Sequence, residues 1–430
     1  MVTEKNSISA IRVRIALLNL FLLACLGTLI RYHFYEPIEG VNLTYLHHAH
    51  SHLAFLGWVF MALFVLVTHQ FLQKNRFFDK SYTYLFFALQ GANFGMLFTF
   101  PFTGYAPWSI AFSTLHTICA IIFTFIFISD LKKEYTGMMW PMSARFVIWA
   151  LIFMLISNLA PFALGPVVSM FGKTDAYYFL VNSYLHFQYN GWFTFALLGL
   201  VIRFLETKDI NTNHPFIKRG LVLKAVAIFP ALSISILSED ENELWFYLAL
   251  LASIIQLLGL CYLLIFFWGN RSHLAFKTQK WVGYIALFAF SALLLQHILH
   301  VLGALPAAVD LLINRQLVVA YLHLVFIGFV TFLIFHQLIT LGILNSGTYM
   351  FLGMALLLIA FIASELLLLT RNFVSHSNLL LFILALLHLI GILTIFSQHK
   401  HRFLPKDDNI PKQSNIIKTI AQTHQKTQVK

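Results

Sequence analysis

The sequence predicts an all-α polytopic membrane protein: about twelve transmembrane helices, arranged as a pseudo-threefold repeat of four-helix units, with both termini cytoplasmic. Composition, the spacing of apolar runs and the distribution of basic residues each point to this class. Of the 430 residues, 59% are hydrophobic and only 10% are charged, whereas a soluble domain uses about 25% charged residues to cover its surface. Most of this chain therefore faces lipid.

The apolar runs give the spans. A helix needs about 20 apolar residues to cross the hydrocarbon core. Runs of that kind predict helices at 11–31, 44–71, 82–101, 107–130, 145–169, 177–203, 219–237, 244–269, 281–303, 315–341, 347–369 and 377–398. The first run lacks a small-residue cleavage site and is interpreted as a retained helix rather than a signal peptide. Residues 1–399 form the membrane domain, and 400–430 form a basic tail that we expect to be disordered and cytoplasmic.

Basic residues give the orientation. With the N-terminus inside, 24 of the 28 Lys and Arg fall in cytoplasmic segments, and the four exceptions are Arg31, Lys173, Arg315 and Arg371. A missed or invented span would scramble this alternation. The net charge of +11 lies in short loops and the tail rather than on one face, so it indicates membrane topology and no nucleic-acid partner. We expect the bacterial-type inner membrane.

Nine histidines from five predicted helices share the outer part of the membrane. At a rise of about 1.5 Å per residue, His52, His116, His186 and His323 lie roughly 12–14 Å below the outer face. Five more lie shallower: His47, His48, His50, His297 and His300. Ionisable groups in lipid are costly and usually face a cavity or one another. Imidazole is also a common ligand of haem iron and copper. For His116, or for His388 on the last helix, a hydrogen bond to a neighbouring helix is the simpler interpretation.

An internal repeat relates three of these histidines. His52 is followed by Gly57-Trp58, His186 by Gly191-Trp192, and His323 by Gly328-Phe329. The three histidines are four predicted helices apart each time, which indicates a four-helix unit repeated three times. Each glycine gives a surface that either a flat macrocycle or another helix can approach.

Twelve helices with histidines on the second, sixth and tenth resemble the haem–copper oxidase subunit I superfamily (cytochrome c and quinol oxidase polypeptide I). The segment His48-Ala49-His50-Ser51-His52, followed by Gly57, is also similar to NnrS-like haem–copper membrane proteins. The resemblance implies a haem, b-type by expectation, held by His52 or His50 and by His323. It implies that His186 ligates a metal ion, copper if one is present. In that family the seventh helix supplies an adjacent pair of histidines. The seventh helix has no histidine here, so His297 and His300 would take the place of that pair.

Other residues are expected to support these ligands. His48 shares a helix face with His52, Tyr189 lies three residues after His186, and His116 lies at the same depth. We interpret these three as neighbours of the ligands rather than ligands. Glu365 is the only acid placed within a predicted span, so proton pumping is not expected.

Three functions stay open on the sequence. The first is a haem or haem–copper protein, redox or nitric oxide/oxygen-related, with cytochrome c or quinol as a redox partner; if it is an enzyme, it is an oxidoreductase of the haem–copper oxidase type. The second is a transporter of a metal ion or small anion. The third is a respiratory assembly subunit without a cofactor. Fold analogy alone does not separate them.

Overall fold

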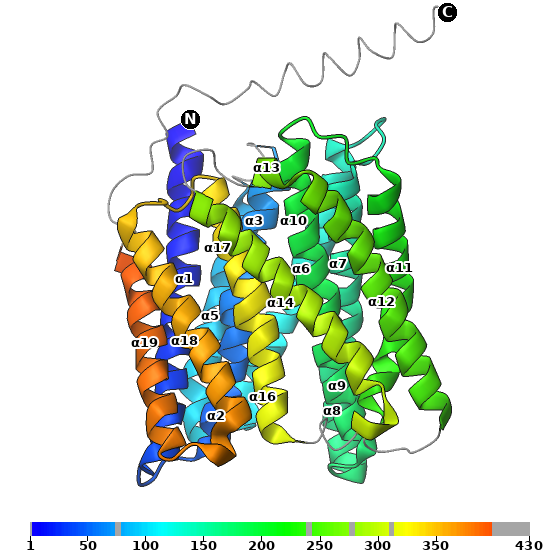
Figure 1. The fold of residues 1–430 in the computed structure, drawn as a ribbon. Coiled ribbons are helices and arrows are strands. Elements are labelled where there is room, and N and C mark those ends of the chain that lie inside the picture. Colours follow the sequence, from blue (N-terminus) through cyan, green and yellow to red (C-terminus); the bar gives the residue numbers. More distant parts are fainter. Residues whose placement is uncertain (1, 74–78, 238–242, 275–279, 309–313, 398–430) are drawn as a thin grey trace, which may run out of the picture.

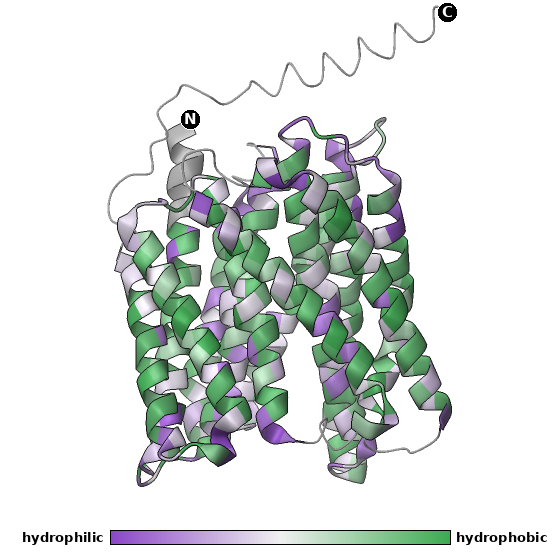
Figure 2. Ribbon diagram, in the orientation of Figure 1, coloured by the Kyte–Doolittle hydropathy of each residue, from purple (hydrophilic) through white to green (hydrophobic). Residues whose placement is uncertain are grey.

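The computed structural model describes residues 2–73, 79–237, 243–274, 280–308 and 314–397, and the predicted tail lies outside them. Within these residues the chain is helical with no strand. Figure 1 shows long helices running side by side in one bundle, with the start of α1 and the end of α19 on the same side. Hydrophobic residues cover the length of the helices, and hydrophilic ones gather toward the two ends of the bundle (Figure 2). This distribution is that of a protein whose solvent is lipid.

The helices follow the predicted spans closely. Ten stretches in the described residues are long and apolar enough to cross a membrane: Ile11–Tyr35, Leu43–Phe71, Lys80–Thr103, Pro107–Glu134, Met142–Phe171, Glu243–Gly269, Lys280–Gly303, Arg315–Thr340, Thr348–Phe373 and Ser377–Ser397. The other two predicted spans are helical as well. One, Asp175–Glu206, carries several polar residues, and the other, Pro215–Ala231, has only 17 residues. The count of twelve spans stays a prediction.

The bundle consists of three similar four-helix units. In each unit the first helix packs against the middle of the second, and the third packs against the fourth. Unit one contains α1 (Val2–Tyr35), α2 with α3 (Leu43–His52, Met61–Phe71), α5 (Lys80–Thr103) and α6 (Pro107–Glu134). Unit two contains α7 with α8 (Met142–Ser157, Leu159–Phe171), α9 with α10 (Asp175–His186, Thr194–Glu206), α11 (Pro215–Ala231) and α12 (Glu243–Gly269). Unit three contains α14 (Lys280–Gly303), α16 with α17 (Arg315–His323, Phe332–Thr340), α18 (Thr348–Thr370) and α19 (Ser377–Ser397).

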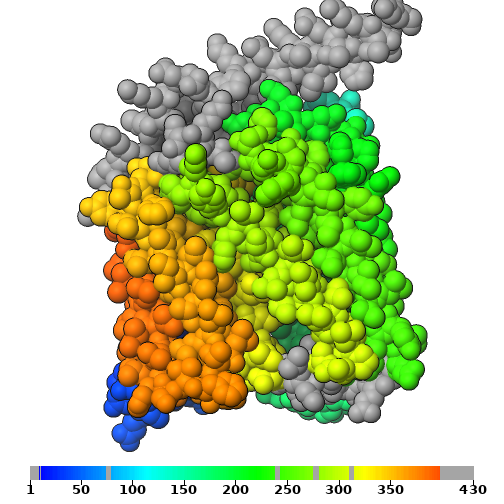
Figure 3. Space-filling model, viewed as in Figure 1, coloured from blue at the N-terminus to red at the C-terminus, as the bar shows by residue number. Residues whose placement is uncertain are grey.

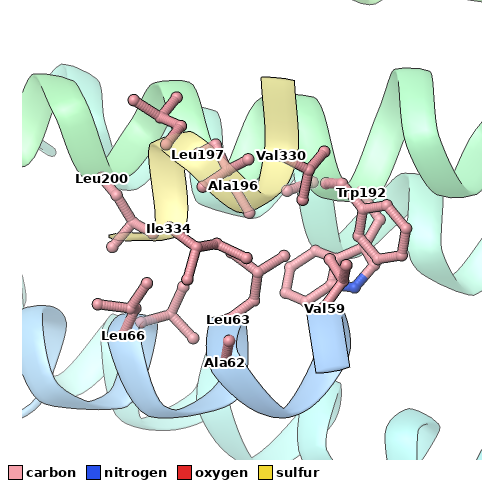
Figure 4. Close-up of a cluster of buried hydrophobic side chains, with 14 of the residues drawn as sticks. Val59, Ala62, Leu63, Leu66, Trp192, Ala196, Leu197, Leu200, Val330 and Ile334 are labelled. Carbon is pink, nitrogen blue, oxygen red and sulfur yellow. The ribbon is translucent and has the colours of Figure 1, made fainter. Parts of the chain in front are cut away.

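The units close into a ring. α6 contacts α7, α12 contacts α14, and α19 packs back against α1. On the face in Figure 3, α14 crosses obliquely between α12 and α18. The second helices of the three units meet at the centre. Figure 4 shows their apolar side chains there, including Leu63, Leu197 and Ile334. This cluster marks the pseudo-threefold axis.

Each second helix changes its winding directly after the repeated histidine. A π-helical segment follows His52 (η1, Leu53–Phe60), His186 (η2, Phe187–Phe193) and His323 (η5, Leu324–Thr331). Because π-helical turns are rare and often lie at functional sites, three at equivalent positions confirm that the motif repeats structurally.

The motif glycines serve helix packing. A Cβ on Gly57 would lie 3.5 Å from Asn19 of α1, one on Gly191 would lie 2.5 Å from Phe153 of α7, and one on Gly328 would lie 3.3 Å from Ala292 of α14. The first helix of each unit therefore approaches the second at its glycine. Of the two roles that the sequence left open for the glycines, the structure shows the approach of another helix.

Candidate functional site

A cavity of about 570 Å³ lies between units one and three. It is lined by α1, α2 with η1, α16 with η5, α18 and α19, and it has the size of a cofactor pocket. Most of its lining is apolar, and its polar side chains include His47, His48, His50, His323 and His388. Two of the three residues predicted as axial haem ligands, His50 and His323, therefore line one cavity from different helices.

A carboxylate orients His323. Its Nδ1 lies 2.9 Å from Oε1 of Glu365 on α18. A carboxylate accepts hydrogen bonds, so Nδ1 carries the proton and Nε2 has the free lone pair. A histidine held by a carboxylate at one nitrogen is typical of metal ligation through the other.

The ring of His50 packs against α1 at Gly27, which has no side chain. A Cβ on Gly27 would lie 3.1 Å from Cε1 of His50, so a larger residue at Gly27 would push the ring. The Nδ1 atom of His50 is buried without a hydrogen-bond partner. His336 and His388 each have one such nitrogen as well, so the feature that distinguishes His50 is its position in the cavity wall beside Gly27.

Three arginines also line the cavity. Arg31 ends the apolar part of α1, Arg315 begins α16, and Arg371 follows α18. They are three of the four basic residues that the sequence placed outside against the general rule. Their deviation from that rule is the sequence signal that could have identified them as site residues.

His52 lies in a different environment. Its ring stacks on Phe100, with centroids 4.4 Å apart, and its Nε2 lies 3.1 Å from the hydroxyl of Tyr105. Tyr105 also packs edge-on against His48. Tyr105 lies in the connection between α5 and α6 and is 56% exposed. His116 is buried against Phe60. His52, His186 and His323 thus do not meet in one cavity.

The remaining predicted metal residues lie on the other side of the bundle. Nε2 of His186 is 2.8 Å from the carbonyl oxygen of Ile228, Nε2 of His297 is 2.7 Å from Nζ of Lys224, and Nε2 of His300 is 2.6 Å from the hydroxyl of Tyr321. Tyr189 packs edge-on against Tyr321. In the described part of the chain, no three His, Cys, Asp or Glu side chains are placed to hold a metal ion. Each of these histidines has a protein partner, so the residues present do not fit copper.

Two features were missed from the sequence. His388, expected to be a packing residue, lines the cavity. Glu365 is not the only acid within a predicted span, because Asp130 is the last residue of 107–130. α6 continues past it to Glu134 and buries Asp130, which bonds with Tyr82 and Lys133. Polar residues at the end of a span hide its last turn from a hydropathy reading.

Comparison with solved structures agrees with this architecture. The chain is similar to a subunit in a cryo-EM structure of a haem–copper terminal oxidase dimer, with a TM-score of 0.69 and 11% sequence identity. The match covers 97% of this chain and 89% of that one. No protein-family model matches the chain, and no curated protein matches it either. The chain therefore has the fold of a haem–copper oxidase subunit, and at this identity the likeness extends to the fold alone.

Proposed function

We propose that this protein is a membrane haem protein with one b-type haem between α2 and α16, ligated by His50 and His323. The observation that supports the proposal best is the cavity lined by both histidines, with the proton of His323 directed to Glu365. Both histidines belong to helices that the sequence predicted to supply the ligands. The chain has no C-x-x-C-H sequence for covalent attachment, so the haem is bound without a thioether link.

The chain's own residues have distinct roles in this site. A bis-histidine haem supplies reversible one-electron transfer. Glu365 fixes the tautomer of His323, and Gly27 makes room for the ring of His50. Arg31, Arg315 and Arg371 line the same cavity and would pair with the two haem propionates, since guanidinium groups bind carboxylates through paired hydrogen bonds.

The physiological role that follows is electron transfer or a nitric oxide- or oxygen-related reaction, with cytochrome c or quinol as the donor, in a bacterial-type inner membrane. Proton pumping is not part of the proposal. In the described helices, acidic side chains stand near the helix ends, so no relay of carboxylates crosses the middle of the bundle.

The experiment is a reduced-minus-oxidised absorption spectrum of the purified protein and four variants, at His50, His323, His336 and His388. We expect a low-spin spectrum that His50→Ala and His323→Ala each convert to high-spin or abolish, because the iron loses an axial ligand. His336→Ala is the matched control. His336 is also a buried helix histidine, but its Nε2 lies 3.0 Å from the carbonyl oxygen of Leu274, away from the cavity.

Two results would contradict the proposal. The first is purified protein with no Soret band after growth with haem precursor. The second is a low-spin band that survives His323→Ala. If His50→Ala leaves the band intact and His388→Ala removes it, the second ligand is His388 and the assignment of His50 is wrong.

A further inference from the structure

A lysine is buried on the side of the bundle away from the haem cavity. Lys224 of α11 is only 1% exposed. Its Nζ lies 2.9 Å from Oε1 of Gln256 and 2.7 Å from Nε2 of His297. Gln256 donates in return from its Nε2 to the carbonyl oxygen of Lys224, at 3.0 Å. Neither partner is acidic, so Lys224 is not half of an ion pair with them.

The hydrogen bonds of His297 show which of its nitrogens is available. Nδ1 lies 2.9 Å from the carbonyl oxygen of Leu293. A carbonyl oxygen only accepts, so Nδ1 carries the ring proton and Nε2 has the lone pair. Lys224 donates to that lone pair. The atom of His297 that would ligate a metal is therefore bonded to an amine.

Two glycines, Gly220 and Gly259, make room for the side chain of Lys224. A Cβ on Gly259 of α12 would lie 2.9 Å from Cγ of Lys224. A Cβ on Gly220 of α11 would lie 3.0 Å from the carbonyl oxygen of Gly259. The two glycines bring α11 and α12 close together and leave a groove for the lysine stem. Gln256, three residues before Gly259, shares that helix face.

The neighbouring histidines also have protein partners. Nε2 of His186 donates to the carbonyl of Ile228, so its Nδ1 accepts from Nδ2 of Asn190, at 3.2 Å. Nε2 of His300 bonds with the hydroxyl of Tyr321. A copper ion at His297 would have to displace Lys224 from the lone pair of Nε2.

We propose that the amine of Lys224 takes the place of a metal ion in this half of the bundle, by occupying the lone pair of His297 Nε2. His186, His297 and His300 are then hydrogen-bonding residues that form a polar network around it.

The first test measures copper. Wild-type protein and His297→Ala are incubated with copper, washed with a chelator and analysed for copper and iron per chain. We expect fewer than about one copper per ten chains in both, because no deprotonated ligand set is free. About one copper per chain in the wild type that His297→Ala removes would overturn the proposal. Iron is counted separately, so failure of the haem assignment does not affect this result.

The second test measures the pair directly by a double-mutant cycle of thermal stability. Lys224→Met and His297→Leu should each lower Tm by several degrees, because each leaves a buried partner unsatisfied. The double variant should lower Tm by less than the sum, because both partners are then apolar. Lys224→Met with His336→Leu is the control cycle and should be additive.

Additive effects of Lys224→Met and His297→Leu would show that the two side chains do not interact and would overturn the proposal. If Lys224→Met does not accumulate, Lys224→Gln starts the same cycle. Its side chain is shorter than that of lysine, so it removes the amine while keeping a polar group in the groove.

Discussion

The bond between His323 and Glu365 makes the electronic character of the proposed haem ligand depend on one carboxylate. At 2.9 Å from Nδ1, the carboxylate strengthens the basicity of Nε2 and adds negative charge near the iron. Ferric haem has one more positive charge than ferrous haem, so this negative charge favours the ferric state.

We therefore predict that Glu365→Gln raises the midpoint potential of the haem, by an amount on the order of tens of millivolts. A redox titration followed at the low-spin band measures it. Glu39→Gln is the matched control, since Glu39 is exposed in the connection after α1 and should leave the potential unchanged. A potential that is equal or lower in Glu365→Gln would show that the carboxylate does not act on the ligand.

At the residue scale, one part of the candidate site was predictable from the sequence and another part was not. The depth of the histidines followed from counting residues along helices, but the surroundings of each ring did not. His50 and His52 are two residues apart, and one lines the cavity while the other stacks on Phe100. Lys224 is basic and near a predicted helix start, so it was counted as cytoplasmic. In the structure Lys224 is buried, because α11 and α12 approach closely at Gly220 and Gly259.

At the element scale, the contact between the first and second helix of each unit depends on a glycine. We predict that Gly191→Ala lowers the stability by about 1–3 kcal/mol, because its Cβ would lie 2.5 Å from Cβ of Phe153 and overpack the contact. Thermal unfolding in detergent measures the change.

Gly91→Ala is the matched control. A Cβ on Gly91, inside α5, would have no atom within 4 Å, so alanine there should be neutral or slightly stabilising through its helix propensity. Equal stability of Gly191→Ala and wild type would mean that α7 and η2 do not pack as closely as described.

The ends of the helices were predictable from the sequence, but the π-helical segments inside them were not. The apolar runs gave the helix ends to within a few residues, because polar breaks mark where lipid ends. The π-helical segments are apolar or buried on nearly every side, so their extra residue per turn leaves no trace in hydropathy. The repeated His-x4-Gly pattern was the only sign of them.

For the whole molecule, the one-sided distribution of basic residues predicts that both termini are cytoplasmic. A reporter fused after Lys430 should behave as cytoplasmic, and one inserted at 237–244, which lies mostly outside the described residues, as external. Topology mapping in cells decides this. A reversed result at either position would mean that the span count of twelve is wrong.

The composition was sufficient to predict the fold class, whereas the closure of the units into a ring required the structure.

That closure has a consequence for chain connectivity. α19 packs against α1 as the last helix of one unit packs against the first helix of the next, and the start of α1 and the end of α19 lie on the same side of the bundle (Figure 1). Each unit contains an even number of predicted spans, so it begins and ends on the same side. The chain can therefore begin at any of the three units in principle, as long as their cyclic order is kept. A circular permutant that joins the ends of the membrane domain and opens the connection between Glu134 and Met142 should insert with the same orientation and rebuild the same haem cavity, now between a new third unit and a new second one.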